Sequence, residues 1–114
     1  MLFCLTAQYT PQALNSMLDD PKTNRAEAVK KLLDAGGGKL VSMYGFAAEG
    51  PSVMVIFDVP DPEMAPSIAG IAVAGGAVHN VKLTRLLAQD EVKNIQQKAR
   101  KIRGAYKPPG KSGK

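Results

Sequence analysis

The side chains best suited to chemistry occur singly in this sequence. His79 is the only imidazole among 114 residues, and Cys4 is the only thiol. Acid–base or nucleophilic catalysis needs such a group beside a partner that orients or activates it, and neither has an acid or a cation next to it in the sequence. A metal site needs a cluster of ligands, which one His and one Cys do not make. We therefore predict no catalytic residues, no metal site and no cofactor, and the sequence favours a role other than independent enzyme.

The run Gly36–Gly37–Gly38–Lys39 has the composition of a phosphate-binding loop but not its context. A P-loop precedes a helix and carries Ser or Thr after the lysine, whereas this run follows a helical pattern and precedes Leu40. Such a run is typical of a helix C-cap. Asp58, Asp61 and Glu63 are likewise explained by a strand end that leads into a helix N-terminus, where acids cap the helix and complement its dipole.

Four strand patterns separated by helical patterns would position these side chains. Strands are predicted at 2–9, 39–46, 53–59 and 78–87. The first helical region has Thr10–Pro11 as its start and a break at Asp20–Pro21, and the second lies between Asp61–Pro62 and Gly75–Gly76. The order βαββαβ, followed by a C-terminal helix, predicts an α+β ferredoxin-like fold in which helices cover one face of an antiparallel sheet.

The strand predicted at 53–59 is apolar on both of its faces. Val53, Val55 and Phe57 alternate with Met54 and Ile56, although a sheet with one solvated face should alternate apolar and polar residues. We therefore predict that a second copy covers the face opposite the helices. The result would be a dimeric α+β barrel, as a homodimer or higher homo-oligomer. The alternative is a central strand that tolerates exposed apolar groups.

A ligand pocket is the kind of site that such a barrel offers, because small ligands bind in apolar cavities that hold a few polar groups. Tyr9 and Tyr44 would each place a ring in the cavity with a hydroxyl at its mouth, and Phe46 and His79 would join them. The sequence thus predicts a ligand-binding site for a small apolar ligand at these four residues. Ordinary core and interface packing of the same side chains is the alternative.

Charge is distributed unevenly along the chain. Residues 93–114 contain eight basic residues and no acid, whereas the rest of the chain contains seven basic and ten acidic residues. The net charge of +5 therefore divides into +8 for a C-terminal arm and −3 for the body. This asymmetry indicates a polyanionic partner or a docking surface.

The arm begins with a helical pattern over 90–103. Its apolar residues recur at spacings of three and four, namely Val92, Ile95, Ala99 and Ile102. We expect this seam to pack on the body or on a partner subunit, with nucleic acid and a docking peptide for another protein as alternatives. The side chains for polyanion binding or docking would be Lys98, Arg100, Lys101, Arg103 and Lys107.

We therefore divide the chain into a ferredoxin-like domain at 1–88, an amphipathic basic helix at 89–103 and a disordered basic tail at 104–114. Its longest uncharged stretch, Met64–Val78, is short for a bilayer and is broken by glycine and proline, so we predict no membrane partner. The single cysteine fits a reducing compartment. A cytoplasmic location is expected.

Several short motifs, taken in series, resemble the GYD domain family. They are Tyr9–Thr10–Pro11, Arg25–Ala26–Glu27, Gly37–Gly38–Lys39, Tyr44, Val59–Pro60–Asp61 and the segment 77–87. The resemblance implies a small ferredoxin-like protein of the dimeric α+β barrel type, and it brings no assigned activity with it. Together with the predicted pocket, this leads us to expect a ligand-binding or accessory protein. The Gly-Tyr-Asp triplet that names the family is not retained, because the chain reads Glu49–Gly50–Pro51–Ser52 there. Related barrels include cofactor-independent and haem-related enzymes, which leaves enzymatic activity as an alternative.

Overall fold

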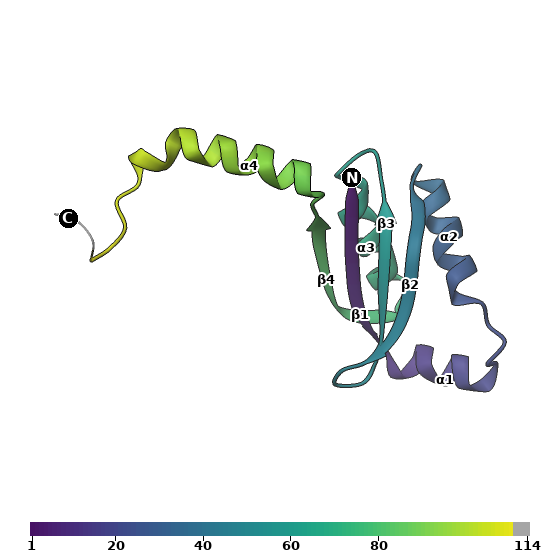
Figure 1. Cartoon of the computed structure of the whole chain (residues 1–114). Helices are drawn as coiled ribbons and strands as arrows, with labels where there is room; N and C mark the ends of the chain where they lie inside the picture. Colours follow the sequence, from purple (N-terminus) through teal and green to yellow (C-terminus); the bar gives the residue numbers. More distant parts are fainter. Residues whose placement is uncertain (111–114) are drawn as a thin grey trace.

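The computed structural model describes residues 1–110 and contains a four-stranded sheet with four α-helices (Figure 1). In chain order the elements are β1 (Leu2–Tyr9), α1 (Pro11–Asp19), α2 (Arg25–Ala35), β2 (Lys39–Ala47), β3 (Pro51–Asp58), α3 (Met64–Ala74), β4 (Val78–Leu86), α4 (Gln89–Ile102) and the 3₁₀ turn η1 (Arg103–Ala105). The predicted βαββαβ order is confirmed, with the first helical region divided into α1 and α2.

The start of α1 and the end of α2 form where the sequence predicts them. Thr10 Oγ1 accepts a hydrogen bond from the Ala13 N–H at 3.2 Å, which caps α1. Asn24 Oδ1 caps α2 in the same way through the Glu27 N–H at 3.0 Å. The glycine run then ends α2, with Gly37 at a φ of 74°. These groups satisfy backbone donors and acceptors that a helix terminus leaves open, so the C-cap interpretation of the glycine run is confirmed.

The sheet is antiparallel throughout, and its strand order is β2-β3-β1-β4. The core lies on the face covered by α2 and α3, where Leu33 and Ile68 pack against the buried side chains of the central strands (Figure 1). Phe3 and Phe57 stack within this core with ring centroids 5.9 Å apart. The buried core consists of Phe3, Leu5, Ala7, Leu33, Val53, Val55, Phe57, Val59, Ala65, Ile68, Ala69 and Val78.

Several element boundaries differ from the expectation, most clearly those of β3, α3 and the tail. The second helix was expected to open at Asp61–Pro62, but α3 begins at Met64, after a turn in which Asp61 Oδ1 accepts from the Glu63 N–H. Pro66 lies in the first turn of α3, where the missing N–H has no intrahelical partner to lose. The tail expected to be disordered from 104 begins with η1, while Lys111 and Lys114 lie outside the described residues.

Helix α4 projects from the body (Figure 1). The described molecule measures 65 × 32 × 22 Å, and its radius of gyration is 18.8 Å. A compact chain of this length would have a radius of gyration of about 13 Å. The expectation that the α4 seam packs on its own body is therefore wrong, and packing on a partner subunit stays a prediction. Within residues 1–110, no helix is both long and apolar enough to cross a membrane.

Candidate functional site

The sheet face opposite the helices carries two rows of side chains that cross all four strands. Direct partners in an antiparallel sheet present their side chains on the same face. The pairing of β1 with β3 and β4, and of β2 with β3, therefore aligns these rows. The first row is Tyr44, Met54, Thr6 and Lys82, and the second is Phe46, Ser52, Gln8 and His79. We call this surface the open face.

A groove of about 710 Å³ lies on the open face near the β2–β3 hairpin. Its apolar lining includes Phe46 and Met54, and its polar lining includes Gln8, Asn80 and Lys82. The remaining lining residues are Thr6, Ala7, Ala48, Glu49, Ser52 and Val81. The size and the mixture of apolar walls with a few polar groups are those of sites that bind small molecules.

An irregularity in β4 shapes one wall of this groove. The register between β1 and β4 shifts between Thr6 and Gln8, and Asn80 has a φ of 52°, in the left-handed region. Asn adopts this conformation more readily than most residues. The Asn80 side-chain Nδ2 donates a hydrogen bond to Gln8 Oε1 at 2.6 Å. The two amides are thereby held together at the groove, with hydrogen-bonding capacity left over for a ligand.

The structure brings together three of the four residues predicted to bind a ligand. Phe46 lines the groove, Tyr44 pairs with the groove residue Met54, and His79 pairs with Gln8. Tyr9 does not join them. It follows the alternation of Phe3, Leu5 and Ala7 and packs against the core on the helix-covered face. Tyr9 and Tyr44 therefore lie on opposite faces of the sheet, so a single groove in one chain does not hold both rings.

The polar residues of the groove lie outside the predicted ligand-binding set, and three of them, Gln8, Asn80 and Lys82, show why. Lys82 alternates with the apolar Val81 and Leu83, a pattern that indicates a strand with one outward polar face. Asn is one of the residue types that adopt left-handed backbone, so an Asn within the predicted strand was the sequence signal for a register shift at position 80. Gln8 carried no signal of its own, because its role depends on a partner that is 72 residues away in the sequence.

Cys4 also lies on the open face, partly buried, where Ile56 and Thr84 are its partners in the sheet. Its strand, β1, is a central strand of the sheet. In the described part of the chain, no three His, Cys, Asp or Glu side chains come close enough to hold a metal ion.

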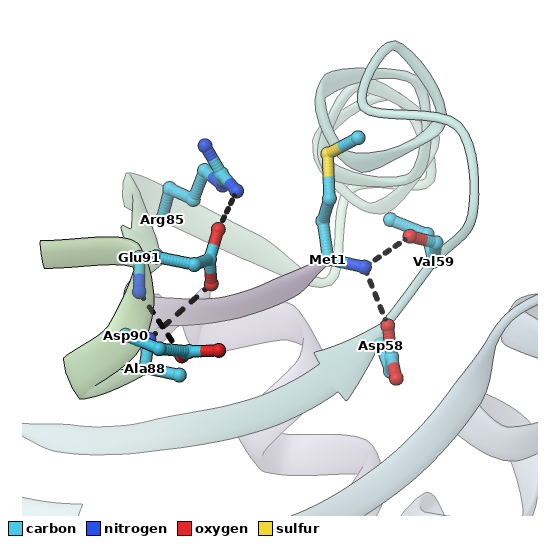
Figure 2. Close-up of polar contacts among 7 residues, drawn as sticks. All are labelled: Met1, Asp58, Val59, Arg85, Ala88, Asp90 and Glu91. Atoms are coloured by element: carbon cyan, nitrogen blue, oxygen red, sulfur yellow. Dashed lines mark hydrogen bonds and ion pairs between the residues drawn. The ribbon is translucent and has the colours of Figure 1, made fainter. Parts of the chain in front are cut away.

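A second surface is the basic side of α4. Figure 2 shows how the helix is attached: Glu91 forms an ion pair with Arg85 and accepts a hydrogen bond from the Ala88 N–H at 3.3 Å. All five residues predicted for polyanion binding or docking are exposed in the structure, namely Lys98, Arg100, Lys101, Arg103 and Lys107. Three of them line a shallow hollow of about 630 Å³ together with Asn94 and Gln97.

Figure 2 also shows the start of β1. The N-terminal ammonium of Met1 donates to Asp58 Oδ1 at 2.7 Å and to the Val59 carbonyl at 2.8 Å. These contacts lie where β3 ends, so the acid at Asp58 has a structural partner. They attach the beginning of β1 to the end of β3.

Comparisons with known proteins agree with the fold. The crystal structure of 30S ribosomal protein S6 from Thermotoga maritima is similar with a TM-score of 0.50 and 16% sequence identity, covering 90% of this chain and 96% of that one. At this identity the likeness concerns the fold, which is ferredoxin-like. A search of curated proteins found no match. The GYD domain matches residues 3–96, which confirms the resemblance of the motifs, and the chain belongs to the GYD domain family.

Proposed function

We propose that this protein is a homodimeric binding protein for a small, largely apolar ligand, which is held in the groove of the open face and enclosed by a second copy. The groove itself is the observation that carries the proposal, because it lies on a sheet face that no element of the described chain covers. The protein would act in the cytoplasm, where a single unpaired cysteine stays reduced.

The apolar character of the open face supports the dimer. Met54 and Ile56 are only partly buried, while Tyr44 is 58% exposed and Phe46 is 38% exposed. Monomeric soluble proteins rarely leave large apolar patches in contact with water. A twofold axis would place the same patch of a second copy against this one and bury both.

The lining supports a ligand with an apolar body and a polar end. Phe46 and Met54 offer an aromatic ring and a flexible thioether for the apolar part. The amides of Gln8 and Asn80 and the ammonium of Lys82 offer hydrogen bonds to the polar part. Glu49 adds an acceptor on the hairpin side of the groove. The ligand needs no metal or cofactor to be recognised in this way.

The proposal is tested with a fluorescent probe that shares this chemistry, anilinonaphthalene sulfonate, beside native mass spectrometry of freshly purified protein. Phe46→Ser should weaken probe binding about tenfold, since it removes the largest apolar wall of the groove. Val41→Ser is the matched control, because Val41 is an exposed apolar residue of β2 outside the groove. Equal probe affinity of the two variants, with no ligand retained by the wild type, would refute ligand binding.

Polyanion binding is a second candidate function, favoured by the exposure of the cations on the projecting α4. If four of these cations meet phosphates of duplex DNA, the logarithm of the affinity should fall with the logarithm of salt concentration with a slope of about −3.6. Fluorescence anisotropy measures this slope. The variant Lys98→Gln with Lys101→Gln should lower it by about 2, and a salt-independent titration would remove this candidate.

A further inference from the structure

The apolar side of α4 is exposed beyond its first turn, whereas Val92 at its start is partly buried. We define the seam as Val92, Ile95, Ala99 and Ile102, which recur at the spacing that places them along one side of a helix. Ile95 is 49% exposed and Ile102 is 71% exposed. Single exposed apolar residues are normal, but a regular stripe is typical of a helix that packs against a surface.

The contacts at the base of α4 accompany its direction away from the body. Only Leu87 and Ala88 separate the end of β4 from the start of α4. Glu91 then holds both Arg85, on β4, and the Ala88 N–H, on the connection (Figure 2). In the structure this connection directs α4 away from the body, so the seam is left open to another molecule (Figure 1).

The charges beside the seam indicate which kind of surface packs against it. Lys98 lies three residues after Ile95 and four before Ile102, and Arg103 lies four after Ala99, so cations border the seam. The surface that receives the seam should therefore be apolar with acidic groups nearby. Duplex DNA meets the charge requirement but offers no apolar surface for a regular stripe.

The body of a second copy meets both requirements. Residues 1–88 contain seven basic and eight acidic residues and have a net charge of −1, whereas residues 89–114, which include α4, contain eight basic and two acidic residues and have a net charge of +6, so arm and body are opposite in charge. It also exposes large apolar side chains on its helices, namely Leu18 on α1 and Ile71 and Val73 on α3. Asp19 follows Leu18 at the end of α1, and Asp61 and Glu63 precede α3, at the opposite end of that helix from Ile71 and Val73.

We propose that α4 is an exchanged arm, whose seam packs on the body of a second copy while the arm of that copy packs in return. A twofold arrangement makes the two contacts identical and covers both seams without a further partner. The hollow at the end of the arm, lined by Ile102, Tyr106 and Pro108 among others, extends the apolar contact beyond the helix. This inference does not depend on the ligand proposed for the open face.

Chemical cross-linking of a mixture of isotopically labelled chains tests the exchanged arm directly. Full-length ¹⁴N and ¹⁵N protein are mixed, left to exchange, and treated with a carbodiimide that joins amines to carboxylates in contact. After exchange of an equal mixture, half of the peptides that link Lys98 or Lys101 to a body carboxylate should contain one chain of each isotope, as random pairing of the copies requires. Links confined to chains of a single isotope, or no arm-to-body links, would overturn the exchanged arm.

A matched pair of variants tests the seam. Ile95→Asp places a charge in the seam and should raise the dimer dissociation constant about tenfold or more, as measured by sedimentation equilibrium. Gln97→Asp adds the same charge on the opposite side of α4 and should leave the constant unchanged. Circular dichroism of both variants checks that the helix persists.

The outcomes separate this inference from the proposed function. If Ile95→Asp and Gln97→Asp dimerise equally while Met54→Asp dissociates the dimer, the open-face interface stands and the exchanged arm is refuted. If Ile95→Asp weakens the dimer while Phe46→Ser still binds the probe like the wild type, the arm stands and the ligand groove fails. Salt-sensitive DNA binding with no effect of Ile95→Asp on the dimer would assign the arm to a polyanion instead.

Discussion

The side-chain amide of Asn80 donates a hydrogen bond to Gln8 Oε1 at 2.6 Å, at the point where the register of β4 against β1 shifts. The backbone of Asn80 is left-handed there, and both residues line the groove of the open face. Backbone strain of this kind persists where the surrounding structure holds it, and it is concentrated at functional sites. The Asn80–Gln8 pair therefore lies at the register shift of the sheet and also forms part of the lining of the candidate site.

Replacement of Asn80 separates the backbone effect from the hydrogen bond. Asn80→Ala and Asn80→Gly both lose the amide, but only Ala has a Cβ that the left-handed backbone disfavours by about 1–2 kcal/mol. We expect the free energy of unfolding of Asn80→Ala to lie about 1 kcal/mol below that of Asn80→Gly. Urea denaturation measures the difference. Equal stabilities would show that the left-handed conformation relaxes at no cost.

The glycine that follows α2 should not tolerate a side chain. A Cβ at Gly38 would lie 2.8 Å from Val59 Cγ1 and 2.9 Å from the Asp58 carbonyl oxygen. Because the second contact is with backbone, Gly38→Ala should lower the free energy of unfolding by about 1–3 kcal/mol. Gly70→Ala is the control on α3, where a Cβ meets open space. It should stabilise the protein by up to about 1 kcal/mol, and destabilisation by both variants would contradict the steric argument.

The two sides of β3 should respond differently to a charge. Val55 is buried against the helices, whereas Met54 lies on the open face. Met54→Asp should dissociate the proposed dimer and leave a folded monomer. The Asp carboxylate would be solvated on the open face of a monomer, but it would be buried without a partner in the dimer interface. Light scattering coupled to size exclusion, with Gln12→Asp on α1 as the control, measures the mass. A wild-type mass of one chain at micromolar concentration would contradict the dimer.

The contact at the base of α4 should contribute to the position of the helix more than to stability. The side chains of Arg85 and Glu91 are 42% and 40% exposed, so their ion pair is screened by solvent. Glu91→Gln should change the free energy of unfolding by less than about 1 kcal/mol. Thermal melts measure this, and a loss well above that value would mean that the pair is buried in the assembled protein.

The sequence by itself determined the features whose bonds close within a few residues. Thr10 and Asn24 cap helices through N–H groups three residues ahead, and the glycine run ends α2 by bonding back to its last turn. The alternation along β3 likewise separated Val55 and Phe57 from Met54 and Ile56 on its two sides. The element order that follows from these signals allows few topologies, and the ferredoxin-like fold is the one observed.

Only the tertiary structure decided which residues share the site and where the arm points. Tyr9 and Tyr44 are both aromatic residues of strands, and the pairing of β1, β3 and β2 places them on opposite faces. Lys82 comes beside Thr6 through the register of β4 against β1, and a shift of one residue would have turned it to the other face. The seam of α4 has the periodicity of a packed helix, yet the short connection after β4 carries it away from its own body. The periodicity of a sequence indicates which side of a helix or strand is apolar and will be buried. Long-range strand pairing and chain connectivity decide which protein surface packs against that side.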